Sequence, residues 1–370
     1  MNFEFSEEQN LLREQAQSFL KDQCSLSAVR SVLDGEQSFD EGLWQQVAAM
    51  GWTATTIPEE YDGLGLSYLE LSVIAEELGR QIAPIPFSSS VYLATEAILL
   101  AGSDAQKAHW LPQLAAGSVI GCLAVNESAG EPTPDTLQSS FSDGEVSGSK
   151  IPVADGDIAH LAVTLVNTSE GPTAVLIDLN QAGVTRTPVK TIDPSRSHAR
   201  LDFAKASAEV LGEPGQGWSL LQRVYDRAAV LFAWEQVGGA ETSLNMAKEY
   251  ALGRFAFGRS IASYQAIKHK LAHAYVKNTL ARSNCYYGAW ALSTNADELP
   301  LAAATARVAA TQAYYYASKE NIQTHGGMGF TWEFDCQFPY RRSKLLAVTI
   351  GSEAVWQEKL ISAVENAQAA

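Results

Sequence analysis

The segment RFAFGRSIASYQAIKHKLA, residues 254–272, separates two long helical patterns in the C-terminal part of the chain. The pattern before it starts at about Trp218 and contains the pair Gly238-Gly239. The patterns after it are rich in alanine, a small residue that lets helix axes approach one another closely. Residues 217–370 are therefore expected to form an antiparallel four-helix bundle.

The amino-acid pattern is different in the preceding part of the chain, residues 119–216. Short runs rich in Val, Ile and Thr, such as HLAVTLVNT at 160–168 and TAVLIDL at 173–179, alternate with Gly, Asp, Ser and Pro. Such runs are typical of strands joined by tight turns. This part of the chain is expected to form a small antiparallel β-barrel domain.

Residues 1–118 have helical periodicity again. The segment SEEQNLLREQAQSFLKDQC opens with Ser6, and Glu8 or Gln9 follows at the spacing of a capping box. A second amphipathic pattern, YLELSVIAEELGRQI, occupies residues 68–82. The predicted fold class is therefore α+β, with an all-α domain, a β-barrel domain and a four-helix bundle at 1–118, 119–216 and 217–370.

The composition excludes several classes of protein. The chain has 370 residues and a formal net charge of −16, and it offers no basic run that could bind nucleic acid. Its four cysteines are scattered without zinc-ligand spacing, so no metal site is expected. The N-terminus lacks the pattern of a signal peptide, and no apolar stretch approaches the roughly 20 residues of a membrane helix. We expect a soluble, cytoplasmic protein without membrane insertion.

Three residues of the opening segment, Arg254, Phe257 and Gln265, have the spacing of an Arg-x-x-Phe-Gly…Gln motif. The stretch IQTHGGMGF, which starts at Ile322, and the weaker stretches FSEEQNLLRE, EYDGLGLS and AVNESAG accompany it. Together with the order of helical, strand-rich and helical parts, these motifs resemble the acyl-CoA dehydrogenase family over nearly the whole chain.

The resemblance implies a cofactor, a reaction and an assembly. Members of this family bind FAD and act in the catabolism of fatty acids or other lipids. A carboxylate base takes the α-proton of an acyl-CoA thioester, and the flavin takes the β-hydride. Electrons usually pass to an electron-transferring flavoprotein. The subunits commonly form dimers of dimers, with each FAD at a dimer interface.

One group of FAD contacts is implied across the dimer interface. Arg254 has a planar guanidinium that suits pyrophosphate oxygens, Phe257 can pack on a ring, and Gln265 can reach polar groups of the cofactor. Gln323 and the backbone of the Gly326-Gly327 pair are expected to approach the adenosine half, because glycine permits a close approach.

A second group of contacts, to the flavin of the same subunit, matches the family less well. Asn126 stands where many relatives have Thr, and Pro152 and Ala154 stand where they often have Trp and Thr. Backbone donors can still serve the flavin ring there. The expected contacts of this group are Val125, Asn126, Val153, Ala154 and Ser352.

The usual positions of the catalytic carboxylate hold apolar residues. Alignment from the GGMGF stretch puts Ile350 at one position, and alignment back from Arg254 puts Ala228 at the other. Glu235 lies two helical turns beyond Ala228, roughly 10 Å along the same face. Its apolar surroundings would raise its pKa, as a general base requires. Alternatively, Glu235 is structural and pairs with an Arg or with the backbone at a subunit contact.

Two interpretations remain open from the sequence. In the first, the chain is a complete acyl-CoA dehydrogenase with a displaced base, Glu235. In the second, it is a non-catalytic subunit that lends half of the FAD site to a second acyl-CoA dehydrogenase-like chain. Heteromeric bacterial relatives, which often act on bulky cyclic or steroid-like acyl-CoAs, resemble the sequence in the stretch GFTWE. A different flavin reaction on the same fold is a third, weaker alternative.

Overall fold

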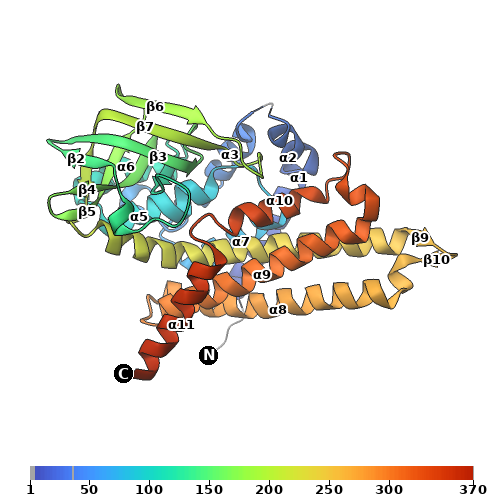
Figure 1. The fold of residues 1–370 in the computed structure, drawn as a ribbon. Helices are drawn as coiled ribbons and strands as arrows, with labels where there is room; N and C mark the ends of the chain where they lie inside the picture. Colours follow the sequence, from blue (N-terminus) through green and yellow to red (C-terminus); the bar gives the residue numbers. More distant parts are fainter. Residues whose placement is uncertain (1–4, 36, 370) are drawn as a thin grey trace. The chain divides into compact units, whose positions relative to one another are not determined.

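The computed structural model describes residues 5–35 and 37–369, and Figure 1 draws the ribbon. The chain divides into two compact units. We call them the helical unit (Met1–Val29, Tyr68–Ala83 and Ala229–Ala370) and the sheet unit (Arg30–Ser67 and Pro84–Ala228). Each unit is thus assembled from segments that lie far apart in the sequence. The division into three domains expected from the sequence remains a prediction.

An eight-stranded sheet forms the centre of the sheet unit, with the order β6-β7-β3-β2-β4-β5-β8 and β1 beside β4. β4 is buried at every residue from Leu161 to Val166, which explains its almost continuous apolar sequence. The strands are β1 (Gly121–Ala124), β2 (Ser140–Ser142), β3 (Glu145–Ala154), β4 (Leu161–Thr168), β5 (Gly171–Asp178), β6 (Val184–Pro188), β7 (His198–Ser207) and β8 (Glu209–Leu211).

Two strand pairs correct the expectation of a purely antiparallel sheet. β1 runs parallel to β4, with Gly121 opposite Leu161, and β2 runs parallel to β4 where Ser140 meets Asn167. Parallel neighbours need a long connection, and a loop followed by the β2–β3 hairpin separates β1 from β4 in the chain. Apolar alternation predicts a strand but not the direction of its neighbour, so the pattern could not reveal this.

Short helices complete the sheet unit. The π-helix η3 (Ser88–Thr95) packs so closely on β1 that a Cβ on Gly121 would lie 2.5 Å from the Cβ of Ala94. The helix α2 (Leu26–Leu33) belongs to the helical unit up to Val29 and to the sheet unit from Arg30 onward. The other elements are α3 (Glu41–Ala49), η3 (Ser88–Thr95), α5 (Glu96–Ala101) and α6 (Asp104–Ala115).

Long helices form the helical unit, and α8 and α9 lie side by side in Figure 1. The capping box predicted at the start of α1 is confirmed, with Gln9 as its second member. Ser6 Oγ accepts the Gln9 N–H at 3.2 Å, and Gln9 Oε1 accepts the Ser6 N–H at 2.9 Å. The helices are α1 (Glu7–Gln23), α4 (Tyr68–Arg80), α7 (Gly217–Gly253, in this unit from Ala229), α8 (Gln265–Ser293), α9 (Leu299–His325), α10 (Gln337–Leu346) and α11 (Glu353–Ala369).

The Gly238-Gly239 pair lets α7 lie close to the backbone of α4 and to the Tyr314 side chain of α9. A Cβ on Gly238 would lie 2.0 Å from the Glu76 carbonyl oxygen of α4, and one on Gly239 would lie 2.4 Å from Tyr314 Cζ of α9. Both distances are far inside van der Waals contact. These glycines therefore determine how closely the helices of the unit pack.

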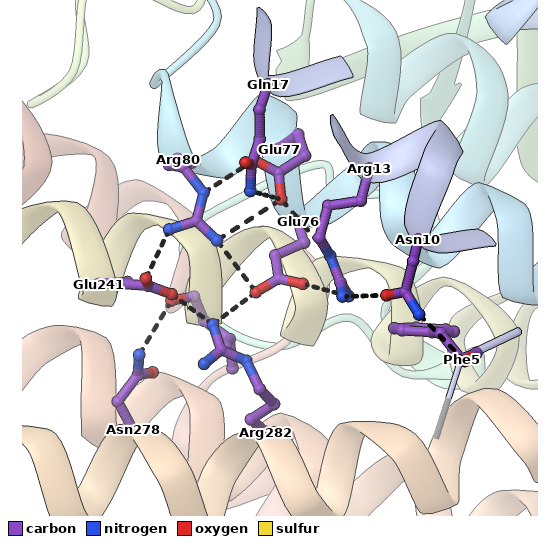
Figure 2. A network of polar contacts seen from close by, with 11 residues as sticks. Phe5, Asn10, Arg13, Gln17, Glu76, Glu77, Arg80, Glu241, Asn278 and Arg282 are labelled. Atoms are coloured by element: carbon purple, nitrogen blue, oxygen red, sulfur yellow. Dashed lines mark hydrogen bonds and ion pairs between the residues drawn. The ribbon is translucent and has the colours of Figure 1, made fainter. Parts of the chain in front are cut away.

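A partly buried charge network, drawn in Figure 2, joins four helices of this unit. Arg282 Nη2 of α8 lies 2.5 Å from both Glu76 Oε1 of α4 and Glu241 Oε2 of α7. Glu76 also pairs with Arg13 of α1 at 3.2 Å. Burial raises the pKa of Glu77, although the neighbouring Arg80 opposes this shift. The N-terminal helices α1 and α4 are thereby bound to the C-terminal bundle within one unit.

Candidate cofactor site

A short hairpin follows α7 and carries one of the candidate FAD contacts, Phe257, with Arg254 directly before it. β9 (Phe255–Ala256) pairs with β10 (Arg259–Ser260), and the turn residues Phe257 and Gly258 both have positive φ, 52° and 80°. Two successive positive φ angles are typical of the tight turn that matches strand twist. The turn leaves Phe257 98% exposed at its tip, in a position to contact a group from outside the chain.

Polar contacts hold the base of this hairpin and fix Arg254 beside it. The Tyr264 hydroxyl donates to the Ala256 carbonyl at 3.0 Å, and the Arg259 guanidinium lies 4.0 Å from the centre of the Tyr264 ring. The Ile261 N–H donates to the Arg254 carbonyl at 2.8 Å. The side chain of Arg254 is exposed, and so is Gln265 at the start of α8. A cation and an amide are therefore presented next to the aromatic tip.

The end of α9 carries the remaining candidates of this group. Gln323, Gly326 and Gly327 are all exposed. Gly326 has φ 61° and ψ −137°, a conformation that requires glycine. A Cβ on Gly327 would meet nothing within 4 Å in the described chain. Because no internal contact demands a glycine at Gly327, its small size fits the close approach of an external group.

His325 at the end of α9 contacts the end of α7, so it connects the helix before the glycine turn to the helix before the hairpin. Its ring stacks on Tyr250 near the end of α7, with centroids 4.1 Å apart, and its Nδ1 donates to the Asn321 carbonyl at 2.9 Å. Burial lowers the pKa of His325, so the stacked ring is neutral at pH 7. The hairpin and the glycine turn consequently lie at the same end of the helical unit, as Figure 1 shows for β9, β10 and the end of α9.

The candidates of the sheet unit lie on two adjacent segments. The Ile151 N–H donates to the Asn126 carbonyl at 2.7 Å, which brings residues 125–126 next to the end of β3. Val125 and Val153 are buried, Ala154 is half-buried, and Asn126 Nδ2 donates to the Gly130 carbonyl at 3.4 Å. These side chains thus provide few polar groups for a flavin. Contacts to a flavin would have to come from the backbone of these two segments.

Glu127 braces the loop after β1. Its carboxylate accepts from the buried Lys150 Nζ at 2.6 Å and from the backbone N–H groups of Gln138 and Ser139. Burial would raise the pKa of Glu127, but these donors outweigh it and lower the pKa. A carboxylate so fully engaged has a structural role.

The two positions of the usual base are closed by packing. Ile350 is 2% exposed, and its carbonyl accepts from Trp356 Nε1 at 3.0 Å. Ala228 is fully buried. Ser352, the remaining candidate contact, is half-buried just before α11. Neither Ile350 nor Ala228 can accept a proton, so a base would have to come from another residue.

Glu235 does not have the isolated, apolar surroundings that the sequence suggested. It is 5% exposed, and its Oε1 lies 3.6 Å from Nη1 of Arg342 on α10. Arg342 in turn donates to the carbonyls of Ala83 and Ile82 at 3.3 and 3.4 Å. This is the arrangement that the structural alternative for Glu235 required, a carboxylate paired with an Arg.

A second buried cation, Arg307 of α9, lies in the same cluster and was missed from the sequence. It donates to Gln236 Oε1 at 2.8 Å and to the Leu346 carbonyl at the end of α10. Burial lowers the pKa of Arg307 to about 9, and Glu235 opposes this shift. Its only signal in the sequence is a single Arg in an alanine-rich helical pattern.

Comparison with known proteins identifies the family. Models of the acyl-CoA dehydrogenase N-terminal and C-terminal domains match residues 6–118 and 215–364. The acyl-CoA dehydrogenase IpdE2 of Mycobacterium tuberculosis is 33% identical over 338 residues, which cover 91% of this chain and 91% of that protein. The chain belongs to the acyl-CoA dehydrogenase family. The resemblance inferred from the motifs is thus confirmed.

Solved structures of the family have the same fold. A chain of the "Tcur3481-Tcur3483 steroid ACAD" superposes with a TM-score of 0.87 at 24% identity, over 98% of this chain and 99% of that chain. A chain of the ChsE4-ChsE5 complex from Mycobacterium tuberculosis superposes with a TM-score of 0.89 at 24% identity, over 99% of each. The predicted acyl-CoA dehydrogenase-like fold is confirmed.

FAD is the cofactor of this family, and the exposed residues at the end of the helical unit fit it. They combine a cation for pyrophosphate, amides, an aromatic tip and an unobstructed glycine turn. Over the described residues, no helix is long and apolar enough to cross a membrane, and no group of His, Cys, Asp or Glu could hold a metal ion.

Proposed function

We propose that this chain is the non-catalytic subunit of a heteromeric acyl-CoA dehydrogenase, and that it lends half of an FAD site to a catalytic partner chain of the same family. The family reaction is FAD-dependent dehydrogenation of acyl-CoA thioesters. The sequence alone left two interpretations open, a self-sufficient enzyme with Glu235 as base and, as the alternative, this role. The contacts of Ile350 and Glu235 now favour the alternative.

The observation that carries the proposal is the packing of the two base positions. Ile350 and Ala228 are 2% and 0% exposed, so each is part of a core rather than the wall of a site. The α-proton of a thioester is only weakly acidic, and its removal needs a positioned base. Glu235, the nearest substitute, is paired with Arg342 at 3.6 Å. The base is therefore expected on the partner.

The residues of this chain would hold and orient the cofactor of that partner. Arg254 would bind the pyrophosphate through its planar guanidinium, and Phe257 would pack against a ring at the edge of the site. Gln265 and Gln323 would donate to polar groups, and the Gly326-Gly327 backbone would lie against the adenosine half. Bound FAD supplies the acceptor for the β-hydride.

The residues expected to contact a flavin bound by this subunit itself are less suited to that role. Val125 and Val153 are buried, and Asn126 bonds to its own loop. We infer that the contacts of Val125, Asn126, Val153, Ala154 and Ser352 to a flavin of this subunit are lost or are made by backbone alone. One FAD for each pair of chains is the expected composition, in a heterotetramer of two such pairs.

The substrate class and the electron acceptor extend the same proposal. Similarity to a "steroid ACAD" and to a complex of two named chains supports a bulky, cyclic acyl-CoA as substrate and a two-chain assembly. The family expectation of an electron-transferring flavoprotein as acceptor is retained. We propose a cytoplasmic site of action for the complex.

The test is to purify the chain alone and with a catalytic chain of the family that has Glu at the position of Ile350. Visible absorption measures flavin per chain, and anaerobic addition of a steroid-like acyl-CoA measures its reduction. We expect the lone chain to bind little FAD and the complex to carry about one FAD per two chains. A lone chain with one FAD that bleaches with acyl-CoA would overturn the proposal.

A further inference from the structure

A pocket of about 600 Å³ lies within the sheet unit, and none of the candidate FAD contacts lines it. One wall is a single face of α3 whose residues recur at helical intervals of three and four: Glu41, Trp44, Gln45, Ala48 and Ala49. Phe39, Ile120, His160 and residues 116–118 line the rest. Small-molecule sites typically have volumes of roughly 300–1,000 Å³, so this pocket is large enough for such a ligand.

Close contacts hold α3 against the turn at 116–118. The indole N–H of Trp44 donates to the Gly117 carbonyl at 2.9 Å, and a Cβ on Gly117 would lie 2.6 Å from the Cβ of Ala48. Gly117 also has φ 67°, a conformation that favours glycine. The shape of the pocket is therefore built into the fold of the unit. Since the N–H of Trp44 is already bonded, this residue offers a ligand only aromatic surface.

His160 supplies a hydrogen-bond donor of defined position. The Ile120 N–H donates to His160 Nδ1 at 3.1 Å, so Nδ1 carries no proton. Burial lowers the pKa of His160, and the ring is therefore neutral at pH 7 with its proton on Nε2. Within the residues that the structure describes, no group accepts from this Nε2–H. It is available to an acceptor atom of a ligand.

The charge of the lining restricts the ligand further. Among the described residues that line the pocket, only Glu41 is charged, and neither its carboxylate nor the Gln45 amide is engaged in a side-chain hydrogen bond with another described residue. The whole chain has a formal net charge of −16. Like charges in contact are costly, so a phosphate or carboxylate group is disfavoured here. An amino group, which donates hydrogen bonds, fits Glu41 and Gln45.

We propose that this pocket binds an uncharged, planar heteroaromatic ligand that carries an amino group, a nucleoside such as adenosine rather than a nucleotide. Phe39 and Trp44 provide aromatic surface for a flat ring. His160 Nε2–H can donate to a ring nitrogen, while the oxygens of Glu41 and Gln45 can accept from the amino group. The inference is independent of the proposed function, because it concerns other residues and holds whether or not the chain is catalytic.

The experiment measures the binding of adenosine and of AMP to the full chain by titration calorimetry. We expect one adenosine per chain, bound at least about tenfold more tightly than AMP because the phosphate is repelled. Ala49→Trp should fill the pocket and weaken adenosine binding at least about tenfold. The matched control is Ala108→Trp on α6, since Ala108 is also an exposed helical alanine of this unit but does not line the pocket. It should bind adenosine like the wild type.

Glu41→Lys is a second variant, which keeps the test decisive if Ala49→Trp does not fold. Glu41 is exposed at the start of α3, so its replacement leaves the core of the unit intact. Reversing the only charge of the lining should reverse the preference, so that this variant binds AMP more tightly than adenosine.

Three results would overturn the proposal. The first is that the wild-type chain binds no adenosine at about 1 mM. The second is equal adenosine affinity in Ala49→Trp and Ala108→Trp, or a Glu41→Lys chain that still prefers adenosine. The third is a wild-type preference for AMP that Arg254→Lys abolishes, because the ligand would then lie at the proposed FAD contacts. This last result would support the proposed function while removing the pocket as a site.

Discussion

Glu235 Oε1 of α7 lies 3.6 Å from Arg342 Nη1 of α10, and both side chains are buried in the helical unit. A general base must exchange its proton with a substrate, whereas this carboxylate is held against a guanidinium that is itself bound to the carbonyls of Ile82 and Ala83. The pair connects α7 and α10 to the segment after α4. We therefore expect Glu235 to stabilise the helical unit rather than to act as the base.

Glu235→Gln is expected to cost stability rather than catalysis. The substitution removes the carboxylate charge that faces the buried Arg342, and breaking a buried ion pair typically destabilises by about 3–5 kcal/mol. Turnover by the complex with the catalytic chain should stay within a few-fold of wild type. Urea unfolding and initial rates measure the two effects. A loss of a hundredfold or more in kcat at normal FAD content would instead identify Glu235 as the base.

Two glycine variants should separate packing from cofactor binding. Gly238→Ala would bring a Cβ to 2.0 Å from the Glu76 carbonyl oxygen, so the chain is expected to unfold or lose several kcal/mol of stability, about the upper range for single substitutions. Gly327→Ala meets nothing within 4 Å, and its free energy of unfolding should change by less than about 0.5 kcal/mol.

FAD content of the complex is the second measurement on these glycine variants. Gly327→Ala should reduce it, because the added methyl group enters the space that the adenosine half is proposed to occupy. Unchanged FAD content in a stable Gly327→Ala complex would count against that contact. The control is wild type carried through the same gel filtration.

Arg254→Lys tests the pyrophosphate contact by a change that keeps the charge. An ammonium is a point charge and cannot form the two parallel bonds of a guanidinium, so FAD affinity of the complex should fall by roughly tenfold or more. Since Arg254 is exposed, thermal stability of the lone chain should be unchanged. Equal FAD affinity in Arg254→Lys and wild type would argue that Arg254 acts only through its charge or does not contact the pyrophosphate.

His325 predicts how stability depends on pH. Burial lowers its pKa below the usual 6.5, so the folded chain binds fewer protons than the unfolded chain between the two values. The stability that the neutral ring contributes is complete above pH 6.5 and is lost as pH falls through the folded pKa. His325→Phe keeps a stacked ring but cannot titrate. Urea unfolding at pH 7 and pH 5 should show a smaller loss for this variant; parallel losses would refute the assignment.

Local sequence patterns predicted much of the fold. The capping box at Ser6, the strand runs and the long helical patterns were predicted correctly, because each depends on contacts between residues a few positions apart. The parallel neighbours of β4 were not, since strand direction follows from the path of the connecting chain.

The sequence by itself indicated the family, because Arg254, Phe257, Gln265 and the glycine turn match its motifs in order. It also showed that Ile350 and Ala228, which have no proton-accepting group, cannot be bases. Only the tertiary structure shows what Glu235 contacts. Its partner Arg342 is more than a hundred residues away in the chain, and whether a carboxylate in an apolar pattern stays isolated or meets a cation depends on how the helices pack. That packing in turn rests on glycines such as Gly238, whose role appears only when a neighbouring helix lies against it.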